Sequence, residues 1–118
     1  MGQPGAVVVS AAEERRDLLV RLFHRVIEDC VTLDLAPHMV QVDEYHSVGV
    51  HFARSTIGEE TARASVDALG EFYGVPVEDD ENSPPTLYTR RGKVDDDLTV
   101  VIYCGVTPPA TEEEESDG

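Results

Sequence analysis

The chain has 118 residues, of which 41% are hydrophobic and 28% charged, a balance typical of a single folded domain. Its 24 acidic residues outnumber its 9 lysines and arginines, which gives a formal net charge of −15. This charge repels phosphate backbones and anionic lipid surfaces, so direct binding to nucleic acid or to a membrane is disfavoured. No signal peptide and no run of 18 apolar residues is visible, and we therefore expect a cytoplasmic protein.

Two further features of the composition bear on the source and the redox state. A single lysine stands against eight arginines, a bias typical of GC-rich coding sequence, which suggests a bacterial source. Cys30 and Cys104 each fall on the apolar side of a patterned segment, where a cysteine behaves as a small buried hydrophobe. We expect two reduced core thiols and no disulfide.

A long helix is predicted over about residues 11–32. Ser10 followed by Glu13 is a capping-box pattern, in which both side chains satisfy free backbone amides of the first turn. Apolar side chains then recur at spacings of three and four, at Leu18, Leu19, Leu22, Phe23, Val26, Ile27 and Cys30. We expect residues 1–9 to be flexible, although the apolar run at 6–9 leaves an additional strand open.

Two antiparallel strands are predicted within residues 38–53, because apolar and polar side chains alternate there. The break at 44–47 is short enough for a hairpin. A second helix is predicted over 57–73. Thr56 and Glu59 form another capping-box pattern before it.

The C-terminal part is predicted to hold three strands and a tail. Val75 and Val77 indicate a short strand, and residues 86–91 and 98–106 a hairpin. Residues 108–118 begin with two prolines and carry five acids but no large apolar side chain, so we expect a disordered acidic tail.

The predicted order of elements is therefore α-β-β-α-β-β-β, within a single domain over residues 10–107. Because the strands come largely as hairpins, we expect an α+β two-layer sandwich. It would consist of an antiparallel sheet of about five strands with both helices on one face.

The sequence offers little for catalysis or for a cofactor. The four histidines, His24, His38, His46 and His51, match no metal-ligand spacing, and the acidic runs at 78–81 and 95–97 lack the EF-hand pattern. No nucleophile elbow, Walker loop or dinucleotide fingerprint is present. We expect no cofactor, no metal and no enzymatic activity; a concave pocket that gathered His51, Arg90 and a carboxylate would reverse that expectation.

The most suggestive residues are those that alternation places on the sheet face away from the core. They are Tyr45, His51, Tyr88, Arg90, Val101 and Tyr103. Tyrosine and arginine are enriched in protein interfaces, so this set predicts a binding face for another protein or for a second copy of the chain. The chain would then be an adaptor or regulator.

Two other functions stay open from the sequence. An acidic surface can imitate the phosphates of nucleic acid and so occupy a DNA-binding protein. Size, charge and the alternation of helices with hairpins are also similar to those of small acidic secretion chaperones, so a chaperone-like binder remains an alternative.

Overall fold

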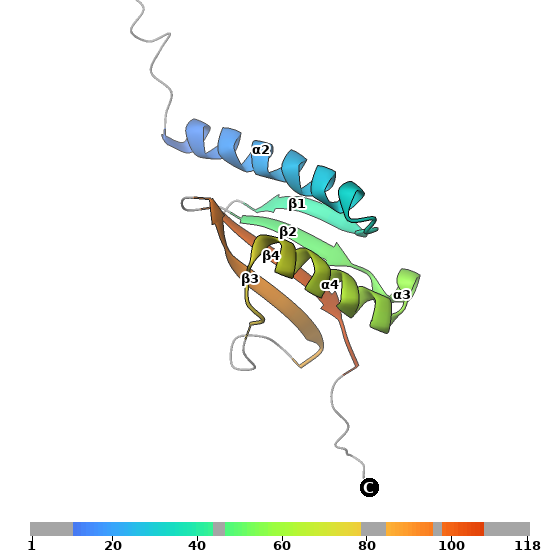
Figure 1. Cartoon of the computed structure of the whole chain (residues 1–118). Helices are drawn as coiled ribbons and strands as arrows, with labels where there is room; N and C mark the ends of the chain where they lie inside the picture. Colours follow the sequence, from blue (N-terminus) through green and yellow to red (C-terminus); the bar gives the residue numbers. More distant parts are fainter. Residues whose placement is uncertain (1–10, 44–46, 79–84, 96–97, 108–118) are drawn as a thin grey trace, which may run out of the picture.

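The computed structural model describes residues 11–43, 47–78, 85–95 and 98–107 (Figure 1). The elements in chain order are α2 (Ala11–Thr32), β1 (Met39–Asp43), β2 (Ser47–Phe52), α3 (Arg54–Ile57), α4 (Glu59–Tyr73), β3 (Leu87–Asp95) and β4 (Leu98–Gly105). The predictions of a flexible N-terminus, of a strand at 6–9, of the Ser10 cap and of a disordered tail lie outside the described residues. The α+β class is confirmed.

The sheet differs from the predicted one, since it has four strands and is mixed. Its order is β1-β2-β4-β3, with antiparallel pairs at β1/β2 and β3/β4 and a parallel pair at β2/β4. The prediction of five antiparallel strands was wrong. After α4 the chain forms β3 at the edge of the sheet opposite β1. The next strand, β4, then lies between β3 and β2 and runs parallel to β2.

The predicted strand at Val75 and Val77 is reduced to a single bridge, between Val77 and Arg90. Two backbone hydrogen bonds join residues 76–78 to β3: Glu78 N–H donates to Thr89 O, and Arg91 N–H donates to Pro76 O. Pro76 has no N–H to contribute, which limits the pairing at this edge.

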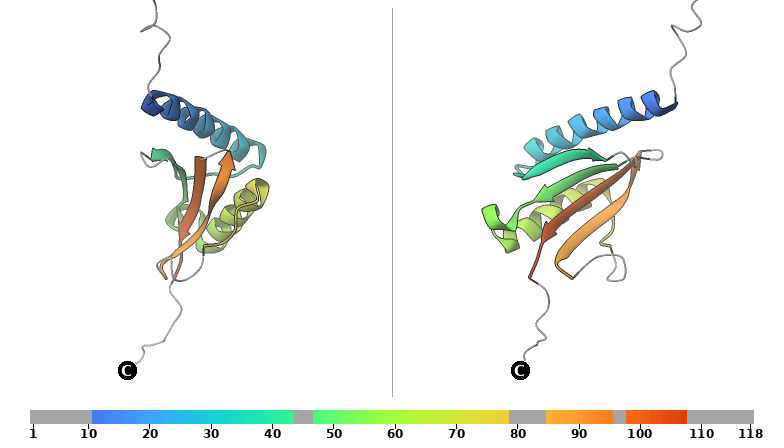
Figure 2. Two further views of the ribbon diagram at one scale, coloured as in Figure 1. Left: turned by 90° about the vertical axis from the view of Figure 1, so that its left-hand side faces the viewer. Right: turned by 180° about the vertical axis from the view of Figure 1, so that it is seen from behind.

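Both long helices cover one face of the sheet, as predicted. α2 packs on β1 and β2, and α4 packs on β2, β4 and β3. Seen from behind, the opposite face of the sheet carries no described element (Figure 2). The core between the helices and the sheet is formed by Leu19, Leu22, Val26, Cys30, Val48, Val50, Phe52, Val66, Leu69, Val100, Ile102 and Cys104, together with smaller contributors.

The helix α2 matches its predicted bounds, but its buried stripe is narrower than the apolar pattern. Leu19, Leu22 and Val26 are buried, whereas Leu18 and Ile27 are each 38% exposed at the margins of the contact. A helix that rests on one sheet buries only the side that faces it.

The helix predicted over 57–73 begins at Glu59, because Gly58 adopts φ 88° and separates α4 from the short helix α3, which was not predicted. The predicted capping box is wrong: no side chain caps α4. Glu59 instead binds the far end of the chain, where its carboxylate accepts hydrogen bonds from Thr107 N–H at 3.0 Å and Thr107 Oγ1 at 2.8 Å. Gly74 ends α4 in the left-handed conformation at φ 72°, which glycine adopts without strain.

The two cysteines are buried and unpaired, as predicted. Burial raises the pKa of the Cys30 thiol and of the Cys104 thiol to about 11. In the described part of the chain, no helix combines the length and the apolar character that crossing a lipid bilayer requires.

Candidate functional site

The face of the sheet that the helices leave uncovered is the candidate site, named here the open face. Pairing register defines it: Val48, Val50 and Phe52 of β2 lie beside Val100, Ile102 and Cys104 of β4 on the helix side. Directly paired residues point to the same side of a sheet, so the residues between them point away from the helices. The open face thus includes Gln41, Gly49, His51, Arg91, Val101 and Tyr103.

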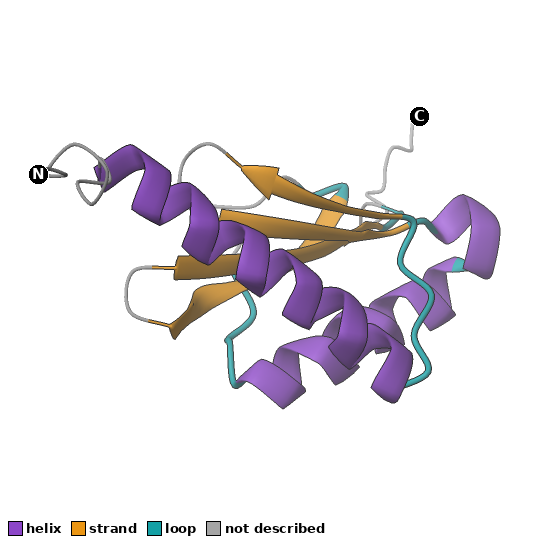
Figure 3. Ribbon diagram, turned by 90° about the horizontal axis from the view of Figure 1, so that it is seen from above, coloured by secondary structure: helices purple, strands orange, loops and turns teal. Residues whose placement is uncertain are grey.

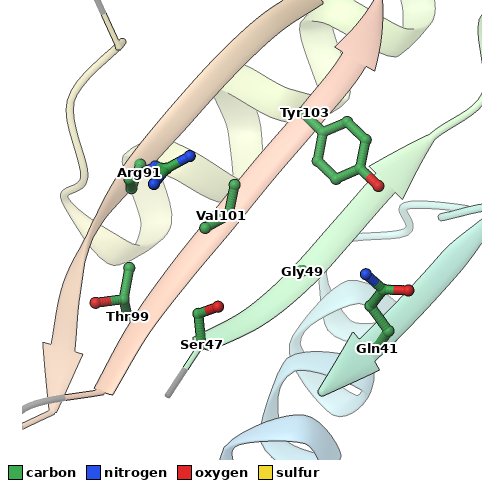
Figure 4. Close-up of a pocket in the computed structure, with 7 residues that line it drawn as sticks. All are labelled: Gln41, Ser47, Gly49, Arg91, Thr99, Val101 and Tyr103. Atoms are coloured by element: carbon green, nitrogen blue, oxygen red, sulfur yellow. The ribbon is translucent and has the colours of Figure 1, made fainter. Parts of the chain in front are cut away.

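A shallow depression of about 400 Å³ lies on the open face. It is lined by Gln41, Ser47, Gly49, Arg91, Thr99, Val101 and Tyr103, which come from all four strands (Figure 4). Gly49 lies between Gln41 of β1 and Val101 of β4 in the pairing. Since Gly49 has no side chain, the sheet is hollowed there between its longer neighbours.

Neither the backbone conformation at Gly49 nor the space around it requires a glycine. A Cβ placed on Gly49 would lie 3.5 Å from Gln41 Cγ, an ordinary van der Waals distance. A larger residue at this position would therefore fill the depression without forcing the strands apart.

Three rings form a row along one end of the depression. His51 stacks on Tyr103, with ring centroids 4.9 Å apart, and His38 meets His51 edge-on at 5.4 Å. Tyr103 leans from β4 across the hollow towards Gln41 (Figure 4). Burial, together with the nearby His38, lowers the pKa of His51, so this row favours the neutral imidazole.

A cationic group lines the opposite side of the depression. Arg91 Nε lies 2.8 Å from a carboxylate oxygen of Glu78, and the Arg91 side chain remains 53% exposed while that of Glu78 is 15% exposed. The ion pair therefore holds the guanidinium in place without covering it. A guanidinium held this way presents donors to a carboxylate or carbonyl group of a ligand.

Two residues predicted for this face, Tyr88 and Arg90, point to the helices instead. Arg90 pairs with Ile102 in the register and therefore shares its side of the sheet. The Tyr88 hydroxyl donates to Asp67 of α4 at 2.6 Å, and Arg90 donates to the same carboxylate at 3.0 Å. Arg90 Nε also donates to the Val75 carbonyl at 2.9 Å.

Of the six predicted interface residues, the structure brings together His51, Val101 and Tyr103. Tyr45 lies outside the described residues. Gln41, Gly49 and Arg91 were not predicted, because they come together only through the order of the strands, which a periodic pattern does not reveal. One feature of the sequence could have indicated the site: a glycine inside an alternating strand, at Gly49, often marks a close approach of another molecule.

His51 and Arg90 lie on opposite faces of the sheet, so they do not share a pocket with a carboxylate, the arrangement that would have indicated catalysis. Within the described ranges, no group of three or more histidine, cysteine, aspartate or glutamate residues is placed to hold a metal ion. The open face combines aromatic, apolar and guanidinium groups, which suits contact with another molecule. Comparisons with protein-family models, with curated proteins and with solved structures found no match.

Proposed function

We propose that the chain is a non-enzymatic adaptor or regulator that binds another protein on the open face of its sheet. The observation that carries this proposal is the depression at Gly49, which lies on a face that no described helix covers. A hollow beside an aromatic ring offers a place for an apolar side chain of the partner.

The chemistry of the lining supports a protein partner. Tyr103 and Val101 supply contact area, and Arg91 supplies directed hydrogen-bond donors at the opposite side. Tyrosine and arginine are enriched in the centres of protein interfaces. A matching segment carries an apolar side chain for the hollow and an acidic or carbonyl group for Arg91.

The test uses peptides selected from a random displayed library on the immobilised full-length protein, with affinities then measured by fluorescence anisotropy. Gly49→Val fills the hollow, and Val101→Glu places a charge at its centre. Each variant should weaken binding of the selected peptides at least tenfold. Circular dichroism and thermal unfolding of both variants establish that the fold is retained.

The control is Phe72→Glu, because Phe72 lies on α4 and is 51% exposed, so the change adds the same charge away from the site. It should leave the affinity within twofold of the wild type. Peptides that bind Gly49→Val and Val101→Glu as tightly as the wild type would refute the open face as the binding surface.

A further inference from the structure

One side of α2 carries an exposed row of three apolar residues and one histidine. Val20, His24, Ile27 and Val31 follow one another at spacings of four, three and four residues, and are named here the outer seam. At 3.6 residues per turn these positions lie within about 60° of one another around the helix. Val31 is 75% exposed, Val20 40% and Ile27 38%.

The outer seam lies to the side of the stripe that packs on the sheet, with Ile27 at the margin of that contact and Val31 as its most exposed member. Contact between α2 and α4 is made on the other side of α2, where Asp29 accepts a hydrogen bond from Tyr73 at 2.6 Å and Arg25 lies over the Tyr73 ring. Asp29 is about 180° from Val20 around the helix. Seen from above, α2 lies in the foreground with no described element over it (Figure 3).

Spacings of four, three and four are those of a coiled-coil contact, in which apolar side chains of two helices interlock. The outer seam is also self-complementary when two copies of α2 run antiparallel. Val20 of each copy then meets Val31 of the other, and His24 meets Ile27. Such reciprocal contacts are the mark of a twofold interface between identical chains.

Two charged residues beside the outer seam match the same arrangement. Arg21 and Glu28 are seven residues apart and therefore flank the seam on one side. Neither makes an ion pair or hydrogen bond within the part of the chain that the structure describes. In the antiparallel arrangement Arg21 of each copy lies opposite Glu28 of the other, which places two ion pairs across the interface.

We propose that a second copy of this chain docks antiparallel along the outer seam of α2, forming a twofold dimer that leaves the open face free. In this register residues 19–32 of the two copies of α2 overlap over about 21 Å, and a helix is about 10 Å wide, so the helix pair buries on the order of 400 Å² in total. Stable interfaces bury above about 1,000 Å². The dimer is therefore weak and forms as concentration rises.

The first test is sedimentation equilibrium of the full-length protein over a concentration series, in about 0.15 M salt to screen the repulsion between two acidic bodies. Wild-type protein should pass from monomer to dimer as concentration rises. Val31→Glu should weaken association at least tenfold, while Phe72→Glu, which adds the same charge on an exposed position of α4, should leave it unchanged.

A charge exchange separates this arrangement from a general effect of charge. Arg21→Glu and Glu28→Arg change the net charge in opposite directions, yet each single variant should weaken the dimer, because each juxtaposes like charges. The double variant restores opposite charges and should recover most of the wild-type affinity.

Two results would overturn the proposal. One is a protein that stays monomeric at every concentration. The other is a dimer that Val101→Glu dissociates and Val31→Glu does not, which would place the second copy on the open face. The peptide-binding test of the open face is read separately, on protein dilute enough to be monomeric.

Discussion

Gly70 of α4 provides the space that the side chain of Arg90 occupies: a Cβ on Gly70 would lie 2.5 Å from Arg90 Cδ and 3.1 Å from Cζ. The Arg90 side chain is only 11% exposed and is held by Asp67. Glycine inside a helix lowers its stability, and at Gly70 the close packing of the Arg90 side chain accounts for it.

Replacing this glycine should destabilise the protein even though alanine is the better helix former. Gly70→Ala gains about 1 kcal/mol of helix propensity. It also forces Arg90 off its rotamer and away from Asp67 and the Val75 carbonyl, and overpacking of this kind costs about 1–3 kcal/mol. The loss of hydrogen bonds adds to that cost, so urea denaturation should show a net decrease in the free energy of unfolding.

The background of Arg90→Ala provides the control for that prediction. With the arginine side chain removed, Gly70→Ala should become neutral or stabilising, because only the propensity gain remains. Equal effects of Gly70→Ala in the two backgrounds would contradict the packing explanation.

The elements that local periodicity determines were predictable from the sequence. The helix over 11–32 and the antiparallel pairs β1/β2 and β3/β4 follow from spacings of three and four or of two, although β3 extends to Asp95, beyond its predicted end at 91. Glu59 shows the limit of local patterns. Its spacing from Thr56 matches a capping box, but its carboxylate binds Thr107, 48 positions later in the chain.

The sequence could not predict which side chains of β3 point to the core, because the strand has too few apolar residues to distinguish its two faces. Alternation placed Tyr88 and Arg90 on the face away from the core, whereas the structure turns both side chains inwards to Asp67. An ion pair and a tyrosine hydroxyl replace the apolar contacts there. The strand order depends equally on non-local contacts, and the depression that spans all four strands follows from that order.

The packing of α2 on the sheet leads to a prediction that distinguishes its two sides. Leu22 is 3% exposed, so Leu22→Ala removes buried side-chain volume and should lower the free energy of unfolding by about 2–5 kcal/mol. Leu18 is 38% exposed, so Leu18→Ala should have a much smaller effect. Chemical denaturation of both variants checks this, and equal losses would show that α2 packs in another orientation.

The buried thiols should resist modification in the folded protein. Burial raises the pKa of Cys30 and Cys104 from 9.0 to about 11, so little thiolate forms at pH 8. Ellman's reagent should react slowly with native protein and fast with two thiols after denaturation. Fast reaction of a native thiol would contradict its placement in the core.

The same pKa shifts make the free energy of unfolding depend on alkaline pH. Between pH 9 and about 11 the unfolded thiols lose their protons while the folded thiols keep theirs. The folded state then binds more protons, and the thiol contribution should lower stability as pH rises through this range. Replacing both residues by alanine should flatten that part of the profile.

His51 should make the free energy of unfolding fall as the pH decreases through the mildly acidic range. Burial and the nearby His38 lower the pKa of His51 below its ordinary value of 6.5. The unfolded chain therefore binds a proton at this residue first as the pH falls, and the free energy of unfolding should decrease below pH 6.5. His51→Phe keeps a ring against Tyr103 but cannot titrate, so it should reduce this decrease.

An NMR titration of the His51 ring protons gives the direct measurement. The midpoint should lie below 6.5 in the wild type. It should rise in Tyr103→Ala, because loss of the ring stacked at 4.9 Å lets water reach the imidazole and stabilise its charged form. A wild-type midpoint at or above 6.5 would contradict the burial of the His51 imidazole on the open face.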